Sequence, residues 1–248
     1  MIELKTASQI ERMRKAGRIV AETLALMREA VHPGITTQEL DHLAEDYIRK
    51  QGAVPAFKGY NGFPATLCTS LNEQVVHGIP GLRKLESGDI ISIDCGAVID
   101  GYFGDAAVTL PVGEIGPDLQ KLLKVTEESL MLGLAQAKKG LRLYDISHAV
   151  QTHVEKHGFS VVRDYVGHGI GRAMHEEPQI PNFGKPGRGP RLEVGMALAI
   201  EPMVNMGTYE VESLSDHWTV VTKDRRASAH FEHTVAVTEN GPEILTLV

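Results

Sequence analysis

The sequence contains a weak internal repeat, and this repeat constrains the fold more than any other feature. Shifting the chain by 106 residues places Gly34–Ala53 on Gly140–Phe159 without a gap, and a shift of 107 places Leu85–Gly88 on Leu192–Gly195. Repetition at this scale is typical of a supersecondary unit that packs against its own copy. The 248 residues are therefore predicted to form a single domain, 1–248, with two related internal halves at about 10–112 and 117–248.

Each half is predicted to hold two helices followed by a pair of strands. Two capping boxes, Ser8 with Glu11 and Thr36 with Glu39, begin the helices of the first half, and apolar residues then recur at helical spacing. Two further helical patterns run from Pro117 to about Ala137 and from Asp145 to His157. Because strands follow the helices in both halves, the predicted fold class is α+β, with a pseudo-twofold axis and an antiparallel sheet that carries the helices on one face.

The segment from Gly88 to Leu110 is predicted to form a β-hairpin with two aspartates inside its strands. If Asp100-Gly101 is a two-residue turn, paired residue numbers sum to 201, so Asp94 lies opposite Ala107. Asp105 then lies on the same face as Asp94, on the diagonal, about 7–8 Å away. Two carboxylates this close repel each other unless a cation lies between them or one is protonated. The alternative for this segment alone is an edge hairpin with two solvent-facing aspartates.

The repeat extends to the acidic residues. Under the shift of 107, Asp94 falls on Glu201, and Asp105 has a counterpart in Glu232, because an apolar strand follows each of them. Four carboxylates are therefore predicted to converge between the two halves. Together with a histidine they suit two adjacent divalent cations, since carboxylates bridge hard cations and imidazole adds a ligand for Mn, Fe, Co or Zn.

Three of the eleven histidines are candidates for this site because they lie in glycine- or proline-rich segments: His77 before Gly-Ile-Pro, His168 in Gly-His-Gly-Ile-Gly, and His175 before Glu-Glu-Pro. The neighbouring Glu176 and Glu177 could also be ligands, but acids in such a turn are more often solvated. The glycine-rich segment lacks the spacing of a phosphate-binding loop. Histidines on helices or at helix ends are expected to be surface or interfacial residues: His32, His42, His148, His153 and His157.

The composition excludes several classes of function. A formal net charge of −7 without a run of Lys or Arg argues against nucleic acid or an anionic membrane as the main partner. Two cysteines, Cys68 and Cys95, are too few for a disulfide framework or a cysteine-rich zinc site, which fits a reducing compartment. The amino terminus has no signal-peptide core, and no segment is apolar over the length of a membrane span. A cytoplasmic protein is expected.

Taken together, seven motifs resemble those of the methionine aminopeptidase family, in its bacterial type I class, from about Ile10 to the end of the chain. The resemblance implies the "pita-bread" fold, in which two pseudo-twofold-related halves form a curved antiparallel sheet covered by helices. It also implies removal of the amino-terminal methionine from nascent proteins and peptides with a small second residue, by water that a dinuclear metal centre activates. The motifs are His77-Gly-Ile-Pro80, Asp94 with Asp105, Gly167-His-Gly-Ile-Gly171, His175-Glu-Glu-Pro178, Glu201-Pro-Met203, Trp218 and Glu232-His-Thr234.

The resemblance further implies a role for each matching residue. Asp105 and Glu232 would bridge two divalent ions (Co, Mn, Fe or Zn), Glu201 would also transfer the proton, and His77 and His175 would be catalytic neighbours that contact the substrate. The complete implied metal ligand set is Asp94, Asp105, His168, Glu201 and Glu232. The implied pocket for the methionine side chain is lined by Tyr60, Phe63, Cys68, His77, Met174 and Trp218.

Two positions depart from the family pattern. Ala106-Ala107 follows Asp105 where many relatives carry Thr-Ser, so a hydroxyl that would orient a ligand is absent, and looser ligand orientation is expected. Met174 stands where an aromatic residue is common, which is expected to widen or soften the methionine pocket.

Two alternatives share this fold and are kept open. Xaa-Pro aminopeptidases and prolidases have the same ligand set, but they usually carry an extra amino-terminal domain, whereas this sequence begins almost at its first predicted helix. Non-catalytic binding proteins of the same fold typically lose ligands, whereas all five are present here. The expected partners are peptide and nascent-chain amino termini, with no membrane and no direct nucleic-acid site. A monomer is expected, and ribosome association and the identity of the metal stay open.

Overall fold

The computed structural model describes all residues from 1 to 248 and confirms the predicted α+β class with an antiparallel main sheet. The four α-helices occur in two consecutive pairs, each followed along the chain by strands, and a short 3₁₀ helix covers Tyr60–Gly62. The α-helices are α1 (Ala7–Ala30), α2 (Thr37–Lys50), α3 (Pro117–Leu134) and α4 (Leu143–Lys156). The strands of the first half are β1 (Val54–Pro55), β2 (Leu67–Leu71), β3 (Gln74–Val76), β4 (Ile90–Ile99) and β5 (Tyr102–Pro111).

The second half contributes ten shorter strands, and the main sheet runs through both halves. Nine strands form this sheet in the order β1-β4-β5-β14-β9-β7-β8, with β2 paired to β4 and β15 paired to β14, all antiparallel. Two three-stranded sheets, β13-β10-β6 and β11-β12-β3, complete the fold. The strands are β6 (Ser160–Val161), β7 (Gly167–Gly169), β8 (Glu176–Ile180), β9 (Ala197–Ile200), β10 (Met203–Asn205), β11 (Val211–Ser213), β12 (Val220–Thr222), β13 (Ser228–His230), β14 (Glu232–Thr238) and β15 (Gly241–Ile244).

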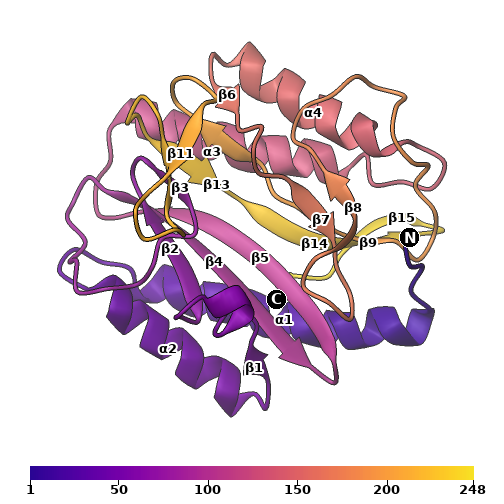
Figure 1. Cartoon of the computed structure of the whole chain (residues 1–248), viewed down its shortest axis with the longest axis horizontal. Coiled ribbons are helices and arrows are strands. Elements are labelled where there is room, and N and C mark those ends of the chain that lie inside the picture. Colours follow the sequence, from indigo (N-terminus) through magenta and orange to yellow (C-terminus); the bar gives the residue numbers. More distant parts are fainter.

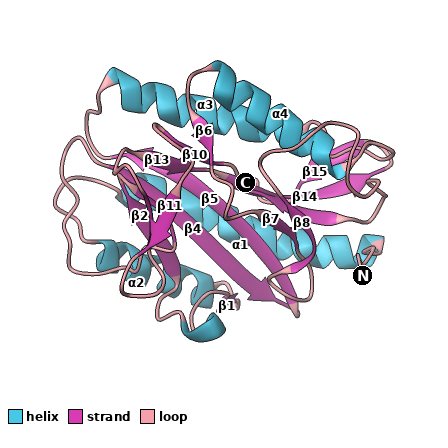
Figure 2. Ribbon diagram, turned by 45° about the horizontal axis from the view of Figure 1, so that its top comes forward, coloured by secondary structure: helices cyan, strands magenta, loops and turns pink.

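The helices pack in pairs at opposite ends of the main sheet. Helix α1 lies beneath β4 and β5, α2 packs beside it against β1 and β2, and α3 and α4 lie beside the strands of the second half (Figures 1 and 2). The first pair buries a stripe of apolar residues, among them Met13, Val20, Leu40 and Ile48, against the sheet. None of the helices combines the length and the hydropathy that a membrane crossing requires.

The internal repeat is visible in the backbone hydrogen bonds. The amide of Gly34 donates to the carbonyl of Leu85 at 2.8 Å, and Gly140 donates to Leu192 at the same distance. Isolated β-bridges occur at equivalent places, between residues 36 and 84 in the first half and between residues 142 and 191 in the second. The two halves thus form equivalent backbone contacts next to their strand pairs. The pseudo-twofold axis passes between β5 and β14.

The central hairpin has the predicted register. Ile99 pairs with Tyr102 and Asp94 pairs with Ala107, and the turn residues Asp100 and Gly101 have φ angles of 52° and 75°. Both angles lie in the left-handed region, as a type I′ turn requires, and aspartate followed by glycine adopts this conformation at low cost. The hairpin therefore fixes which face carries Asp94.

One helix start differs from the prediction. The second capping box, Thr36 with Glu39, is confirmed, but α1 begins two residues earlier than Ser8 and Glu11 imply. Its N-cap is Thr6, whose side chain accepts a hydrogen bond from the amide of Gln9. The reason is that the glutamine three residues after Thr6 completes a capping box as well as a glutamate does, so two overlapping boxes compete and the earlier one is used.

Candidate metal centre

The four predicted carboxylates lie together on the face of the sheet away from α1 and α3. Asp94 and Asp105 come from the central hairpin, Glu232 begins β14, and Glu201 directly follows β9. Ala107 pairs with Asp94 on one side and with Glu232 on the other, so a methyl group separates these two carboxylates along one row of the sheet. The convergence predicted from the repeat is therefore confirmed as geometry.

The seam between the two halves, where β5 pairs with β14, carries two further hydrogen bonds beside the acids. The hydroxyl of Thr234 donates to the carbonyl of Asp105 at 2.8 Å and accepts from the amide of Asp105 at 3.2 Å. This pair of bonds joins β5 to β14 beside the acids. It fixes the backbone that carries Asp105 relative to Glu232.

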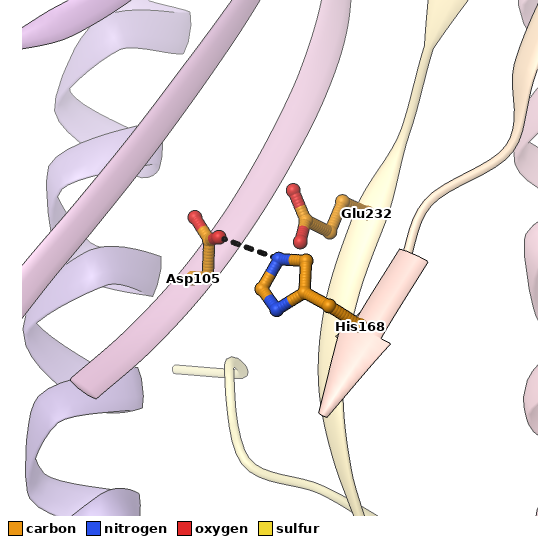
Figure 3. A group of neighbouring side chains, drawn as sticks. All are labelled: Asp105, His168 and Glu232. Atoms are coloured by element: carbon orange, nitrogen blue, oxygen red, sulfur yellow. Dashed lines mark ion pairs between the residues drawn. The ribbon is translucent and has the colours of Figure 1, made fainter. Parts of the chain in front are cut away.

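His168 completes the cluster from β7. Its Nε2 lies 3.6 Å from Asp105 Oδ2 and 3.6 Å from Glu201 Oε1. Figure 3 shows that Asp105 and Glu232 point from neighbouring strands toward this imidazole. The Nδ1 of His168 lies 2.9 Å from the carbonyl oxygen of Gly169, so its N–H donates there and leaves the Nε2 lone pair facing the acids.

The glycines that flank His168 have a packing reason. A Cβ on Gly167 would collide with the carbonyl oxygen of Ala199 on β9, and a Cβ on Gly169 would collide with that of Glu177 on β8. Only glycine allows the three strands to approach so closely. The Gly-His-Gly segment is therefore a device for bringing an imidazole into a crowded acidic site.

The site has the electrostatics of a cation site. Burial, together with the charges of Asp105 and Glu201, raises the pKa of Asp94 well above its ordinary value, and burial and the same neighbours raise the pKa of Glu232. Burial opposes the charged form of His168, but the hydrogen bond with Asp105 and the charge of Glu201 outweigh it and raise the pKa of His168.

Several buried polar atoms at the site have no partner within the protein. They are Asp94 Oδ1, Asp105 Oδ1, Glu232 Oε1 and His230 Nε2. Buried polar atoms are normally hydrogen-bonded, and an orphaned carboxylate oxygen is costly. Hard or borderline divalent cations satisfy carboxylate oxygens and imidazole nitrogens together, so these residues fit a divalent metal.

A cavity of about 210 Å³ opens above the carboxylates. Its lining includes every residue that the sequence assigned to the site: Tyr60, Phe63, Cys68, His77, Asp94, Asp105, His168, Met174, His175, Glu201, Trp218 and Glu232. One wall is apolar, because Phe63, Cys68 and Met174 form a small cluster with Phe57, and Phe63 meets the edge of Trp218 at a ring distance of 5.1 Å. Burial raises the pKa of the Cys68 thiol, which keeps it protonated and suits an apolar pocket.

His175 and His77 lie at the cavity without bonding to the acids. The Nδ1 of His175 lies 2.9 Å from the hydroxyl of Tyr60, and its ring centroid lies 4.4 Å from that of His168. Burial and the neighbouring His168 lower the pKa of His175, and burial lowers the pKa of His77 to about 4. Both rings are therefore neutral near pH 7 and able to donate a single N–H.

The structure adds three residues that the sequence did not assign. Phe57 and Asn61 line the cavity, and His230 lies beside Glu201 and Glu232. The signal for His230 is its spacing, because residues two apart in an extended segment face the same side, and His230 precedes Glu232 by two. No comparable pattern marks Phe57 or Asn61.

The expectation for one acid of the Glu-Glu-Pro turn was wrong. The side chain of Glu176 is 14% exposed, not solvated, and it forms an ion pair with the buried Lys5. Its Oε1 also accepts hydrogen bonds from the amides of Arg172 (2.7 Å) and Ala173 (3.1 Å). Glu176 thus shapes the loop that carries Met174 and His175. It is tied to the segment before α1, where the amide of Lys5 donates to Gly195.

Replacing Lys5 with methionine is expected to destabilise the protein by about 3–5 kcal/mol, because it leaves a buried carboxylate without its counter-charge. Chemical unfolding measures this loss, and hydrogen exchange is expected to become faster in the segment 171–176. Lys139→Met is the matched control, because Lys139 pairs with Glu239 at 2.8 Å but both side chains are more than half exposed. Equal stability of the two variants would contradict the role given to Lys5.

Comparison with known proteins decides the family. The sequence matches the profile described as metallopeptidase family M24 over residues 11–239. The chain belongs to metallopeptidase family M24. An M24 metallopeptidase depends on divalent metal, in agreement with the donor set above.

Within family M24, this chain is most similar in length and sequence to methionine aminopeptidases among the proteins compared below. It is 60% identical to methionine aminopeptidase 1 of Bacillus subtilis, over all of both chains. It superposes on the crystal structure of methionine aminopeptidase from Thermotoga maritima with a TM-score of 0.98 and 50% identity, again over all of both chains. A prolidase from Pyrococcus furiosus shares the fold, with a TM-score of 0.78 and 24% identity over 99% of this chain and 65% of that one.

Proposed function

We propose that this M24 metallopeptidase removes the amino-terminal methionine from nascent proteins and peptides whose second residue is small. One observation carries the proposal: a single cavity joins the buried acids, the two neutral histidines and an apolar wall. The full-length identity to methionine aminopeptidases supports it. The apolar wall suits an unbranched thioether side chain, and the acidic floor suits the cationic amino terminus next to it.

We propose that Asp94, Asp105, His168, Glu201 and Glu232 would hold two divalent ions, and that Asp105 and Glu232 would be ligands of both. A divalent ion in such a site lowers the pKa of bound water toward 7 and polarises a carbonyl oxygen. The donor set supports Mn, Fe, Co or Zn. The orphaned oxygens of Asp94, Asp105 and Glu232 support this assignment, because each is buried without a partner.

The remaining steps are proposed for side chains of the chain itself. Glu201 accepts a proton from the attacking water as the new carbon–oxygen bond forms, and it delivers that proton to the amine nitrogen as the peptide bond breaks. His175, neutral and oriented by Tyr60, donates a hydrogen bond to the oxygen that gains negative charge. His77 lines the other part of the cavity and contacts the substrate.

The methionine side chain is proposed to lie against Tyr60, Phe63, Cys68, His77, Met174 and Trp218. Chain 1–248 is proposed to act as one catalytic domain, because the donors come from both internal halves. We further propose a cytoplasmic monomer that acts on nascent-chain amino termini, with or without ribosome association. A formal net charge of −7 without a run of Lys or Arg argues against a membrane or nucleic acid as its main partner.

Release of methionine from short peptides tests the proposed reaction. With added Co²⁺ or Mn²⁺, Met-Ala-Ser is expected to be cleaved about 10- to 200-fold faster than Met-Lys-Ser, a range typical of discrimination by the fit of a side chain. Ala-Ala-Ser is the control for the methionine side chain and is expected to be a poor substrate. Faster cleavage of Ala-Pro-Ser than of Met-Ala-Ser would favour the prolidase-like alternative. Metal binding without cleavage of any peptide would favour the non-catalytic one.

A further inference from the structure

His230 lies in the acidic cluster, although neither the sequence motifs nor the proposed mechanism uses it. It ends β13, is 1% exposed, and its backbone is fixed by Thr109, whose hydroxyl accepts from the amide of His230 and donates to its carbonyl, both at 2.8 Å. Its Nε2 is buried and has no hydrogen-bond partner. A buried imidazole nitrogen without a partner is costly. A bound group that interacts with Nε2 would remove this cost.

The distances around His230 resemble those around His168. His230 Nε2 lies 3.5 Å from Glu201 Oε2 and 3.9 Å from Glu232 Oε2, and His168 Nε2 lies 3.6 Å from Glu201 Oε1. The two histidines therefore face the two different oxygens of one carboxylate. Donors bound at about 2.0–2.2 Å to one ion, at angles near 90–110°, lie roughly 3.0–3.6 Å apart. The distance from His230 to Glu201 lies within this range, and the distance to Glu232 exceeds it by a few tenths of an ångström, so a small inward shift of the side chains would let all three bind one ion.

A direct hydrogen bond does not account for His230 as well. The separations of 3.5 and 3.9 Å are longer than the 2.7–3.2 Å of a good N–H···O bond. The other carboxylate oxygen of Glu232, Oε1, is buried and has no hydrogen-bond partner either. Glu201, His230 and Glu232 form a three-donor group whose ligand atoms all lie within 4.8 Å of one another.

We propose that His230 is a sixth protein ligand of the metal centre and binds through Nε2 the ion that Glu201 and Glu232 hold on this side. The centre then contains two imidazoles, one on each side of Glu201. Imidazole suits Zn, Co and Fe better than Mn, so His230 biases the centre toward the former ions. The proposal rests on the metal centre proposed above, and its test does not depend on peptidase activity.

Titration of the metal-free protein with Co²⁺ and Mn²⁺ tests the assignment, with wild type, His230→Gln and His233→Gln compared by calorimetry. His233 is the matched control because it is partly buried and lies three residues after His230. Its Nδ1 is hydrogen-bonded to the hydroxyl of Thr246 at 2.8 Å, away from the acids. Loss of His230 is expected to weaken Co²⁺ binding at least tenfold and Mn²⁺ binding less, because loss of a ligand costs at least as much as loss of its outer partner. The control is expected to bind as wild type does.

Proton NMR of the Co²⁺-loaded proteins gives a second readout. Wild type is expected to show two strongly shifted, exchangeable imidazole N–H signals, and His230→Gln is expected to keep one. Unchanged affinity and two retained signals in a folded His230→Gln protein would overturn the proposal, even if its peptidase activity fell, since His230 would then act only through Glu201. Failure of wild type to release methionine would count against the proposed function alone and leave the ligand assignment standing.

Discussion

Asp105→Asn is expected to reduce metal affinity by more than about 100-fold and to lower the rate of methionine release in proportion. In the proposed centre Asp105 would be shared between two ions, and a neutral amide would hold them poorly. Outer-shell partners alone are worth 10- to 100-fold in affinity, so a bridging ligand is worth more. Metal content after dialysis and kcat on Met-Ala-Ser, measured on the same sample, check this expectation.

The metal-free form of the same variant is expected to change in the opposite direction. Without ions, burial and then the charges of neighbouring carboxylates, Asp105 first among them, raise the pKa values of Asp94 and Glu232, so removing the charge of Asp105 relieves repulsion. The thermal midpoint of metal-free Asp105→Asn should therefore lie above that of the metal-free wild type. Asp100→Asn is the matched control, since it lies at the exposed turn of the same hairpin and should alter neither quantity. Full metal loading of Asp105→Asn would show that the acid is structural.

His175→Ala is expected to lower kcat by about 10²–10³ while both metals stay bound. Loss of one hydrogen-bond donor to a developing oxyanion has an effect of this size. His175 contacts Tyr60 and the ring of His168 but none of the carboxylates at hydrogen-bond distance, so its removal should spare the ions. Steady-state kinetics on Met-Ala-Ser with metal analysis gives both numbers.

His168→Ala separates the two histidines. Its Nε2 faces two acids, so this variant should bind metal weakly and recover part of its rate at high metal concentration. His42→Ala, an exposed histidine on α2, should behave as wild type does. Rescue of His175→Ala by added metal, without rescue of His168→Ala, would mean that the two roles are reversed.

Local patterns were sufficient to predict the parts of the fold that local geometry determines. Asp100-Gly101 set the hairpin register, which in turn set the face of Asp94 and Asp105, and the structure has that register. The shift of 107 residues correctly paired Asp94 with Glu201, because duplicated strands keep their side-chain alternation. The capping box of α1 was wrong because two overlapping boxes satisfy the same rule.

Contacts between distant segments could not be predicted in this way. The ion pair between Lys5 and Glu176 joins residues 171 positions apart, and nothing in either segment specifies the other. His230 was missed because its spacing from Glu232 suggests a shared face but not what that face meets. Phe57 reaches the cavity from a loop, where no periodicity constrains side-chain direction.

The seam between β5 and β14 has a mechanical consequence. The two halves meet there through a short ladder, Glu232 opposite Ala107 and His233 opposite Ala106, and the acids stand on both of its sides. An ion bound by Asp105 and Glu232 would therefore act as a removable cross-link between residues more than one hundred positions apart. Unlike a disulfide, which persists in the unfolded chain, such a link exists only in the folded state, so its binding free energy would add to the stability of the folded protein. Metal supply would then set not only how fast the enzyme works but how long the two halves stay docked.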